Sequence, residues 1–166
     1  TALLVGMLPG LAQAHARRLV HRAIQPARIR MTEDGPLLTG FGVALTEGRS
    51  LQYLAPELWR NRAQPSAASD VYALGVTLYE SLTGALPFPR GLPPSAYASL
   101  HTRQGIPDVR ERRPDTPQWL ADAIQTATRI NPKERFRSAG EMIQAIQAAR
   151  AAPPPQAKPR LPDAPG

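Results

Sequence analysis

The stretch "SDVYALGVTLYESLTGALPF", Ser69–Phe88, carries the most apolar helical pattern of the chain. Its large apolar side chains recur three and four residues apart, which is the spacing of one buried helix face; they are Val71, Leu74, Leu78 and Leu82. Ser69 is typical of a helix cap, and Gly84 followed by Pro87 is typical of a helix end. The pattern therefore predicts a central, buried helix on which the rest of the domain packs.

Further helices are predicted on both sides of this one. A first helix is expected from about Pro9 to Leu19, with an inward face of Leu8, Leu11 and His15. Thr116 and Pro117 predict the start of another, with an inward face of Trp119, Leu120, Ala123, Ile124 and Ala127. "SAGE", Ser138–Glu141, resembles a capping box that opens a last helix with an inward face of Met142, Ala145, Ile146 and Ala149. Asp34-Gly35 predicts a tight β-hairpin turn between two short apolar runs.

Composition limits the classes of function. A chain of 166 residues with 42% apolar content can form one domain with a core, and its apolar runs are too short for a membrane span. The absence of cysteine excludes disulfides and thiolate metal sites, and it is compatible with the cytoplasmic location that we expect. The net charge of +7 could attract nucleic acid, but the arginines are scattered among acids, so a nucleic-acid partner is not favoured.

The end of the chain differs from the rest. Residues 151–166 read "AAPPPQAKPRLPDAPG" and contain six prolines with almost no large apolar side chains. Such a segment cannot bury enough surface to fold, so we expect a proline-rich tail or linker. Residues 1–150 are expected to form the domain.

An ordered set of short motifs carries a family resemblance. They are "HAR" and "LVHRAIQPARI", then "GFG", "YLAPE", the central-helix stretch and "NPKERF". From about Leu8 to Ala149 this order resembles the C-terminal lobe of the bacterial, eukaryotic-like serine/threonine protein kinases. The resemblance implies a mainly α fold, a helical bundle with a small β-hairpin, and a smaller N-terminal lobe that we expect to be absent. "GMLPG", Gly6–Gly10, has the wrong spacing for a phosphate-binding loop.

Several landmarks of this resemblance are structural. It implies an ion pair between Glu57 and Arg135, which we expect to be buried, and contacts from Asp70 to the backbone around His21 and Arg22. Arg22 could also clamp a phosphate on the segment that follows, where Thr46 and Ser50 supply hydroxyl groups. Phe41 and Gly42 retain the second and third positions of their motif, and Gly75 is expected to let the central helix pack closely. His21 has no ligating residue at a suitable spacing, so an architectural role is favoured over a catalytic or metal-binding one.

The positions that perform chemistry in such kinases are altered. Phosphoryl transfer needs an Asp base, a Lys, and an Asn and a second Asp that hold magnesium. By the resemblance, these positions are occupied here by Ala23, Gln25, Arg28 and Gly40, respectively. Ala and Gly offer no oxygen ligand, and Arg would repel a cation. We therefore expect no metal site and neither ATP nor magnesium as a cofactor of this chain.

Three hypotheses follow for the function. The leading one is a catalytically inactive, kinase-like domain that binds a protein partner or regulates it. The alternative enzyme hypothesis is a serine/threonine kinase that transfers phosphate from ATP when completed by other segments, with Glu33 or Asp34 as a substitute metal ligand. A third hypothesis, resting on charge alone, is a basic module that binds nucleic acid or an anionic membrane surface.

Overall fold

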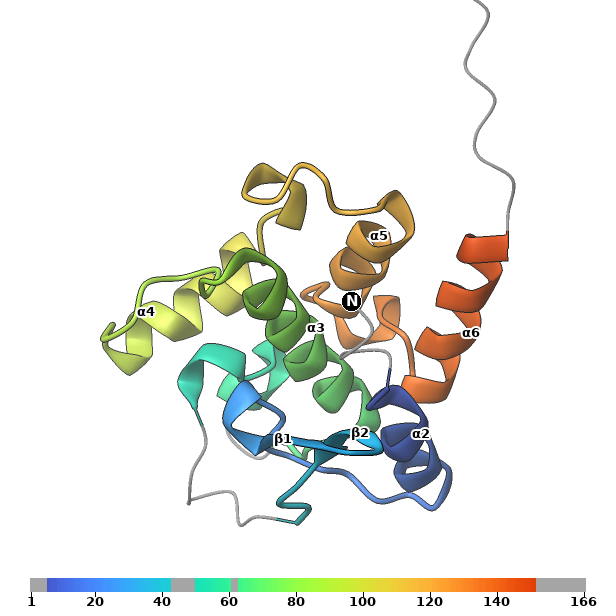
Figure 1. Ribbon diagram of the computed structural model, residues 1–166. Coiled ribbons are helices and arrows are strands. Elements are labelled where there is room, and N and C mark those ends of the chain that lie inside the picture. The colour runs from blue at the N-terminus through green and yellow to red at the C-terminus, as the bar shows by residue number, and fades with distance from the viewer. Residues whose placement is uncertain (1–5, 43–49, 61–62, 152–166) are drawn as a thin grey trace, which may run out of the picture.

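The computed structural model describes residues 6–42, 50–60 and 63–151. It is mainly helical with one small hairpin, as the fold prediction stated. Figure 1 shows the arrangement of the longer elements: α2 (Leu8–Ala16), β1 (Ile29–Thr32), β2 (Gly35–Leu38), α3 (Ala67–Thr83), α4 (Pro94–Ser99), α5 (Gln118–Ala127) and α6 (Ala139–Ala151). The predicted tail lies outside the described residues except for Ala151, so its prediction stays open. Among the described helices, none is long and apolar enough to cross a membrane.

Helix α3 lies at the centre of the molecule (Figure 1), and every residue from Ser69 to Tyr79 is buried. Its predicted start was wrong by one turn: Ser66 is the N-cap, and Ser69 completes a capping box by accepting a hydrogen bond from the Ser66 backbone N–H. Gly84 ends the helix in the left-handed conformation, as predicted. A Cβ atom at Gly75 would lie 2.6 Å from the Thr128 methyl carbon, which confirms that glycine permits the close packing of α3 against the end of α5.

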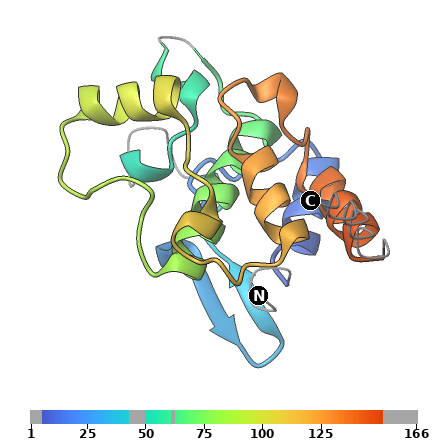
Figure 2. The same ribbon diagram turned by 90° about the horizontal axis from the view of Figure 1, so that it is seen from above.

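The hairpin formed by β1 and β2 projects from the helical body (Figure 2). Thr32 pairs with Gly35, so Glu33 and Asp34 form the turn. Of the pair Asp34-Gly35, only the glycine supplies a left-handed backbone, with a φ of 116°. On one face Ile29 and Leu38 pack against the core, which anchors the hairpin to the helices.

The predicted helix boundaries need three more corrections. Helix α2 ends at Ala16, earlier than expected, where Arg17 caps it. Thr116 does not cap α5, because its hydroxyl donates to the Arg113 carbonyl and Pro117 occupies the cap position. The Ser138 hydroxyl does accept the Glu141 N–H, but the Glu141 carboxylate accepts from the Arg137 backbone N–H and so closes the turn one residue early.

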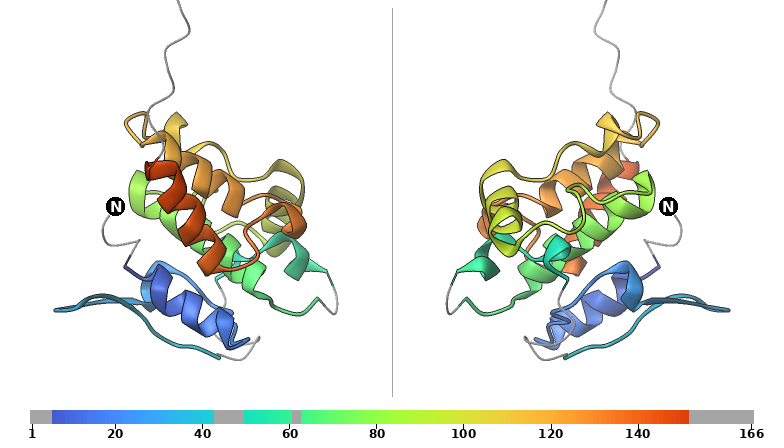
Figure 3. Two further views of the ribbon diagram at one scale, coloured as in Figure 1. Left: turned by 90° about the vertical axis from the view of Figure 1, so that its right-hand side faces the viewer. Right: turned by 90° about the vertical axis from the view of Figure 1, so that its left-hand side faces the viewer.

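Helices α5 and α6 and the segment α4 complete the body. Residue Ala149 of α6 is exposed, against the prediction, whereas Met142 and Ile146 are buried. Helix α4 continues into a π-helical turn, Leu100–Gln104, which the sequence pattern did not reveal. Figure 3 shows α2 beside the hairpin at the base of the molecule, with α5 and α6 above it.

Candidate functional site

The segment His21–Arg28, called the loop segment below, is held in place by one carboxylate of α3. Asp70 Oδ2 accepts a hydrogen bond from the His21 backbone N–H at 2.6 Å, and Oδ1 accepts from the Arg22 N–H at 2.8 Å. Asp70 is 1% exposed, so these hydrogen bonds are made away from water. The contacts expected of Asp70 are therefore present. They fix the course of the loop segment although Arg22 adopts a left-handed backbone, with φ of 75°.

His15 completes this arrangement, and the sequence patterns did not assign it this role. Its Nδ1 accepts the Ala139 backbone N–H at 3.1 Å, so the neutral ring carries its proton on Nε2. That Nε2–H donates to Asp70 Oδ2, 3.1 Å away. One imidazole thus joins α2, α3 and the start of α6. The "HAR" motif marked the residue, but only the tertiary structure reveals its two partners.

His21 has an architectural environment. Its Nδ1 accepts the Ala23 backbone N–H at 3.3 Å, and its Nε2 donates to the Thr39 carbonyl at 3.0 Å. The Phe41 ring lies against it edge to face, with 4.5 Å between centroids. Burial is the main cause that lowers the pKa of His21 below its ordinary value, despite the opposing effect of Asp70. The ring is neutral and fully engaged, which supports the structural reading over catalysis.

Arg28 and Gly40 meet at the base of the hairpin. Arg28 directly precedes β1 and Gly40 follows β2 by two residues, and the Thr39 N–H donates to the Arg28 carbonyl at 2.8 Å. A Cβ atom built on Gly40 would lie 2.7 Å from Arg28 Nη1 and 3.2 Å from Arg28 Cδ. The Arg28 side chain thus fills the space that any side chain at position 40 would need. Two of the residues that the family resemblance assigns to metal-binding positions are therefore in direct contact.

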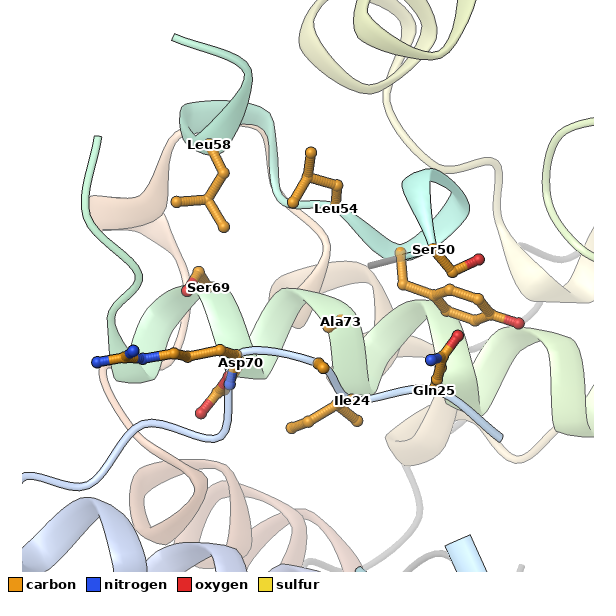
Figure 4. A pocket seen from close by; sticks show the side chains of 11 residues that line it. Ile24, Gln25, Ser50, Leu54, Leu58, Ser69, Asp70 and Ala73 are labelled. Atoms are coloured by element: carbon orange, nitrogen blue, oxygen red, sulfur yellow. The ribbon is translucent and has the colours of Figure 1, made fainter. Parts of the chain in front are cut away.

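Ala23 and Gln25 line a different cavity, between the loop segment and residues 50–58. Figure 4 shows Gln25 and Asp70 on one side of it and Ser50, Leu54 and Leu58 on the other. Its volume of about 20 Å³ is only slightly more than one water molecule needs. Arg22 and Ser50 both line this cavity, whereas Thr46 lies outside the described residues. The site residues are therefore split between the cavity and the base of the hairpin.

The ion pair expected between Glu57 and Arg135 is present and bidentate. Arg135 Nη1 and Nη2 donate to the two carboxylate oxygens at 3.0 and 2.8 Å. The Arg135 side chain is fully buried, whereas that of Glu57 is 20% exposed, so only one half of the pair is buried as predicted. Arg135 also donates to the carbonyls of Ala68, Arg129 and Ile130. The guanidinium thereby joins the segment before α3 to the segment before α6.

The residues at the assigned metal-binding positions, Arg28 and Gly40, have no side-chain oxygen for a metal ion. Within the described part of the chain, no group of three or more His, Cys, Asp or Glu side chains is placed to hold a metal ion. At the base of the hairpin the Arg28 guanidinium brings a positive charge to the space beside Gly40, and neither residue has a carboxylate or amide oxygen in its side chain. The residues present do not fit the magnesium ions that kinases use.

Comparison with known proteins is consistent with the fold and the motif order. Residues 1–147 match the family model described as protein kinase domain. The chain is 36% identical to serine/threonine-protein kinase C of Synechocystis, with 87% of this chain and 29% of that protein aligned. It is 31% identical to the probable serine/threonine-protein kinase PknB of Lactococcus lactis and 35% identical to PknA of Mycobacterium tuberculosis. Those two alignments cover 85% and 83% of this chain, and 24% and 34% of the relatives.

The chain thus spans a quarter to a third of the length of these curated relatives. The family model, in contrast, extends over most of the chain and includes every motif named above. The helical fold around α3, the Glu57–Arg135 pair and the Asp70 contacts agree with this match. The chain therefore belongs to the protein kinase family, among the bacterial, eukaryotic-like serine/threonine kinases.

Proposed function

We propose that this chain is a kinase-like domain without phosphoryl-transfer activity, and that its retained scaffold binds or regulates a protein partner. The contact between Arg28 and Gly40 is the observation that carries the proposal. In the family these two positions hold magnesium through an Asn and an Asp. Here Arg28 stands at the position of the Asn, and its guanidinium group fills the space beside Gly40 that the Asp side chain would need. If only one metal ligand were replaced, the other could still bind the ion, but here both ligand positions have lost their oxygen atoms.

The loop segment supports the same proposal. Ala23, at the position of the catalytic Asp, has no side-chain acceptor for a proton. A positioned general base contributes about 10²- to 10⁴-fold to a rate, and loss of the metal ligands removes further charge stabilisation. Meanwhile Asp70, His15 and His21 keep the backbone of the segment in place. The scaffold is retained where the reactive groups are replaced, as a binding role requires.

The alternative enzyme hypothesis needs a substitute metal ligand. Glu33 and Asp34, the nearest acids in sequence, form the exposed turn of the hairpin. Four strand residues separate the turn from Arg28, a length of about 13 Å at 3.3 Å per residue. Neither carboxylate is therefore placed to replace the ligands missing beside Gly40.

The test uses the protein in its full natural length, with and without ATP and magnesium. We expect no magnesium-dependent shift in its melting temperature with ATP, and no transfer of the ATP γ-phosphate to the protein itself or to a generic protein substrate. The variant Ala23→Asp should remain equally inactive, because the altered positions 25, 28 and 40 are still present. Magnesium-dependent turnover by the natural protein would refute the proposal.

A further inference from the structure

A separate hollow lies between the turn Pro56–Trp59 before α3 and the loop before α6, and we call it the Ile130 pocket. Its volume is about 350 Å³, at the lower end of the range found for ligand pockets. It shares no described lining residue with the cavity at Ala23. The described residues that line it are Pro56, Glu57, Arg60, Thr102, Ile130, Asn131, Pro132 and Lys133. Three segments that are far apart in the chain therefore meet around this pocket.

The buried guanidinium group of Arg135 fixes two walls of the Ile130 pocket. On one side it donates to both carboxylate oxygens of Glu57, at 3.0 and 2.8 Å. On the other side it donates to the backbone carbonyls of Ile130 and Arg129, at 2.9 and 2.6 Å. Because one fully buried side chain is bonded to both walls, the pocket is held in a preformed shape. A preformed site loses less conformational entropy when a ligand binds.

The Ile130 pocket presents apolar surface to solvent. Ile130 is 37% exposed. One side of its side chain packs against Gly105, because a Cβ atom built on that glycine would lie 3.7 Å from Ile130 Cδ1. Pro56 and Pro132 add two rings without polar side-chain atoms to the lining. An apolar side chain that enters the pocket would leave water and contact these three residues, which is favourable.

The lining of the Ile130 pocket carries a positive charge. Arg60 and Lys133 are exposed, and neither forms an ion pair within the described part of the chain. Glu57 is the one acid of the described lining, and both of its carboxylate oxygens accept hydrogen bonds from Arg135. The negative charge of Glu57 is therefore balanced, whereas the two cations are left for a ligand.

The residues next to the lining in sequence are also more basic than acidic. Arg103 and Arg129 are exposed, and neither forms an ion pair within the described ranges. Glu134 is the one acid that directly adjoins a lining residue, and its carboxylate accepts a hydrogen bond from the Asn131 side-chain amide at 3.0 Å. Positive charge thus surrounds an apolar hollow.

We propose that the Ile130 pocket binds a segment of a partner protein in which carboxylates flank one large apolar side chain. The apolar side chain would lie against Ile130, and Arg60 and Lys133 would pair with the carboxylates. Charge complementarity selects this occupant, and an apolar centre with a charged rim is typical of a site that recognises a peptide. The inference rests on the proposed binding role and names the site and the class of partner.

The test is a selection of short random peptides displayed on phage, with the full-length protein as bait. We expect the selected peptides to be rich in Asp and Glu and to contain Leu, Ile, Phe or Trp. Synthetic copies labelled with fluorescein should bind the protein in anisotropy titrations. The variant Arg60→Glu/Lys133→Glu should weaken their binding by about tenfold or more, because it turns two attractive charges into repulsive ones.

A matched variant separates this effect from a general loss of positive charge. Arg113→Glu/Arg150→Glu changes the net charge equally, but Arg113 precedes α5 and Arg150 lies in the last turn of α6, whereas the pocket lies after α5 and before α6. It should bind the peptides as the natural protein does. Circular dichroism melting checks that both variants are folded. Should no peptide be selected, should the peptides lack an acidic bias, or should the pocket variant bind them unchanged, the inference is wrong.

The position of the apolar side chain is tested separately. Replacing it by Ala in a selected peptide should weaken binding to the natural protein by about fivefold or more. The same replacement should have a smaller effect on binding to the variant Ile130→Ala, because that protein has already lost the contact. Equal losses with both proteins would contradict the placement of this side chain against Ile130.

Two further comparisons complete the test. Double-stranded DNA is titrated against the same variants, and binding tighter than that of the peptides, lost in the pocket variant, would overturn the peptide assignment. The phosphotransfer assay is independent of these outcomes. A protein that transfers phosphate and still binds the peptides would refute only the proposed lack of activity, and one that does neither would refute only this inference.

Discussion

Arg28 and Gly40 are two residues whose contact could have been anticipated from the hairpin, because the residues that flank its two strands must meet. Sequence motifs treat the two positions separately and give no sign that one side chain fills the space of the other. The contact explains why glycine is suitable at position 40. Its φ of 81° disfavours any other residue, and the Arg28 side chain leaves no room for a Cβ atom.

The first prediction concerns this pair. Gly40→Ala should lower the free energy of unfolding by about 1–2 kcal/mol through the left-handed backbone alone, with an added cost because Arg28 must move. In an Arg28→Ala background the added cost disappears, so the two substitutions should show a favourable coupling of about 0.5–1 kcal/mol. Urea unfolding of the four proteins measures the coupling. Strictly additive effects would show that Arg28 does not occupy the space beside Gly40.

His101 supplies the second prediction, on pH. It is fully buried among the rings of Trp59, Tyr72, Phe88 and Tyr97, and burial lowers its pKa from 6.5 to about 4. The Tyr72 hydroxyl lies 2.6 Å from Nδ1, while Nε2 has no hydrogen-bond partner among the described residues. On acidification the unfolded chain binds the proton first, so the stability that the neutral ring contributes above pH 6.5 is lost as the pH falls towards 4.

The loss from this residue should be about 2 kcal/mol between about pH 7 and pH 5. It is measured as the free energy of unfolding in urea at the two values. His101→Gln is expected to be less stable at neutral pH, because it disturbs the aromatic surroundings, but its stability should decline less on acidification. His21 also has a lowered pKa and is retained in this variant, so it serves as the internal reference. Parallel pH profiles would contradict the assignment to His101.

At the scale of elements, periodicity predicted which segments are helices better than it predicted where they begin. Ser66 and Ser69 are both suitable caps, and the sequence alone does not reveal that they act together in one capping box. Thr116 does not cap α5, because its hydroxyl donates a local hydrogen bond to the Arg113 carbonyl instead. Helix α4 and its π-helical turn escaped prediction because both are short and α4 begins with Pro94.

The third prediction concerns Arg135, which joins several segments of the fold. Its guanidinium binds Glu57 and three backbone carbonyls, and it lies 4.7 Å from the centre of the Tyr72 ring. Arg135→Met should therefore lower the free energy of unfolding by about 3–5 kcal/mol, the cost of breaking a buried pair from one side. Arg137→Met is the matched control, because that arginine is 87% exposed and pairs with Glu141 near the surface. Similar losses for both variants in urea unfolding would contradict the proposed joining role.

At the scale of the whole molecule, the fold was predictable because the motifs follow one another in a known order around a single buried helix. The site was predictable only in part. The assignment of Ala23, Gln25, Arg28 and Gly40 to altered motif positions stays a prediction, and the motifs did not reveal the division of these residues between a small cavity and the hairpin base. A hollow of about 490 Å³ between α2 and the loop segment was missed altogether. It is built from residues of α2, the loop segment and the chain after β2, which only the tertiary structure brings together.

The distribution of charge over the whole molecule leads to the last prediction. Five of the twenty Lys and Arg side chains pair with carboxylates among the described residues: Arg90, Arg110, Arg113, Arg135 and Arg137. Arg17, Arg18 and Arg22 form no ion pair among the described residues and line one hollow, so together they could contact about three phosphates of DNA. The logarithm of the binding constant should then fall with the logarithm of salt concentration with a slope of only about −2.7, and binding should be weak at physiological salt. Anisotropy titrations of labelled duplex DNA over a range of salt concentrations measure this slope. A slope of about −6 or steeper, with binding that persists at ~0.15 M salt, would require a broad basic surface and would favour the nucleic-acid hypothesis instead.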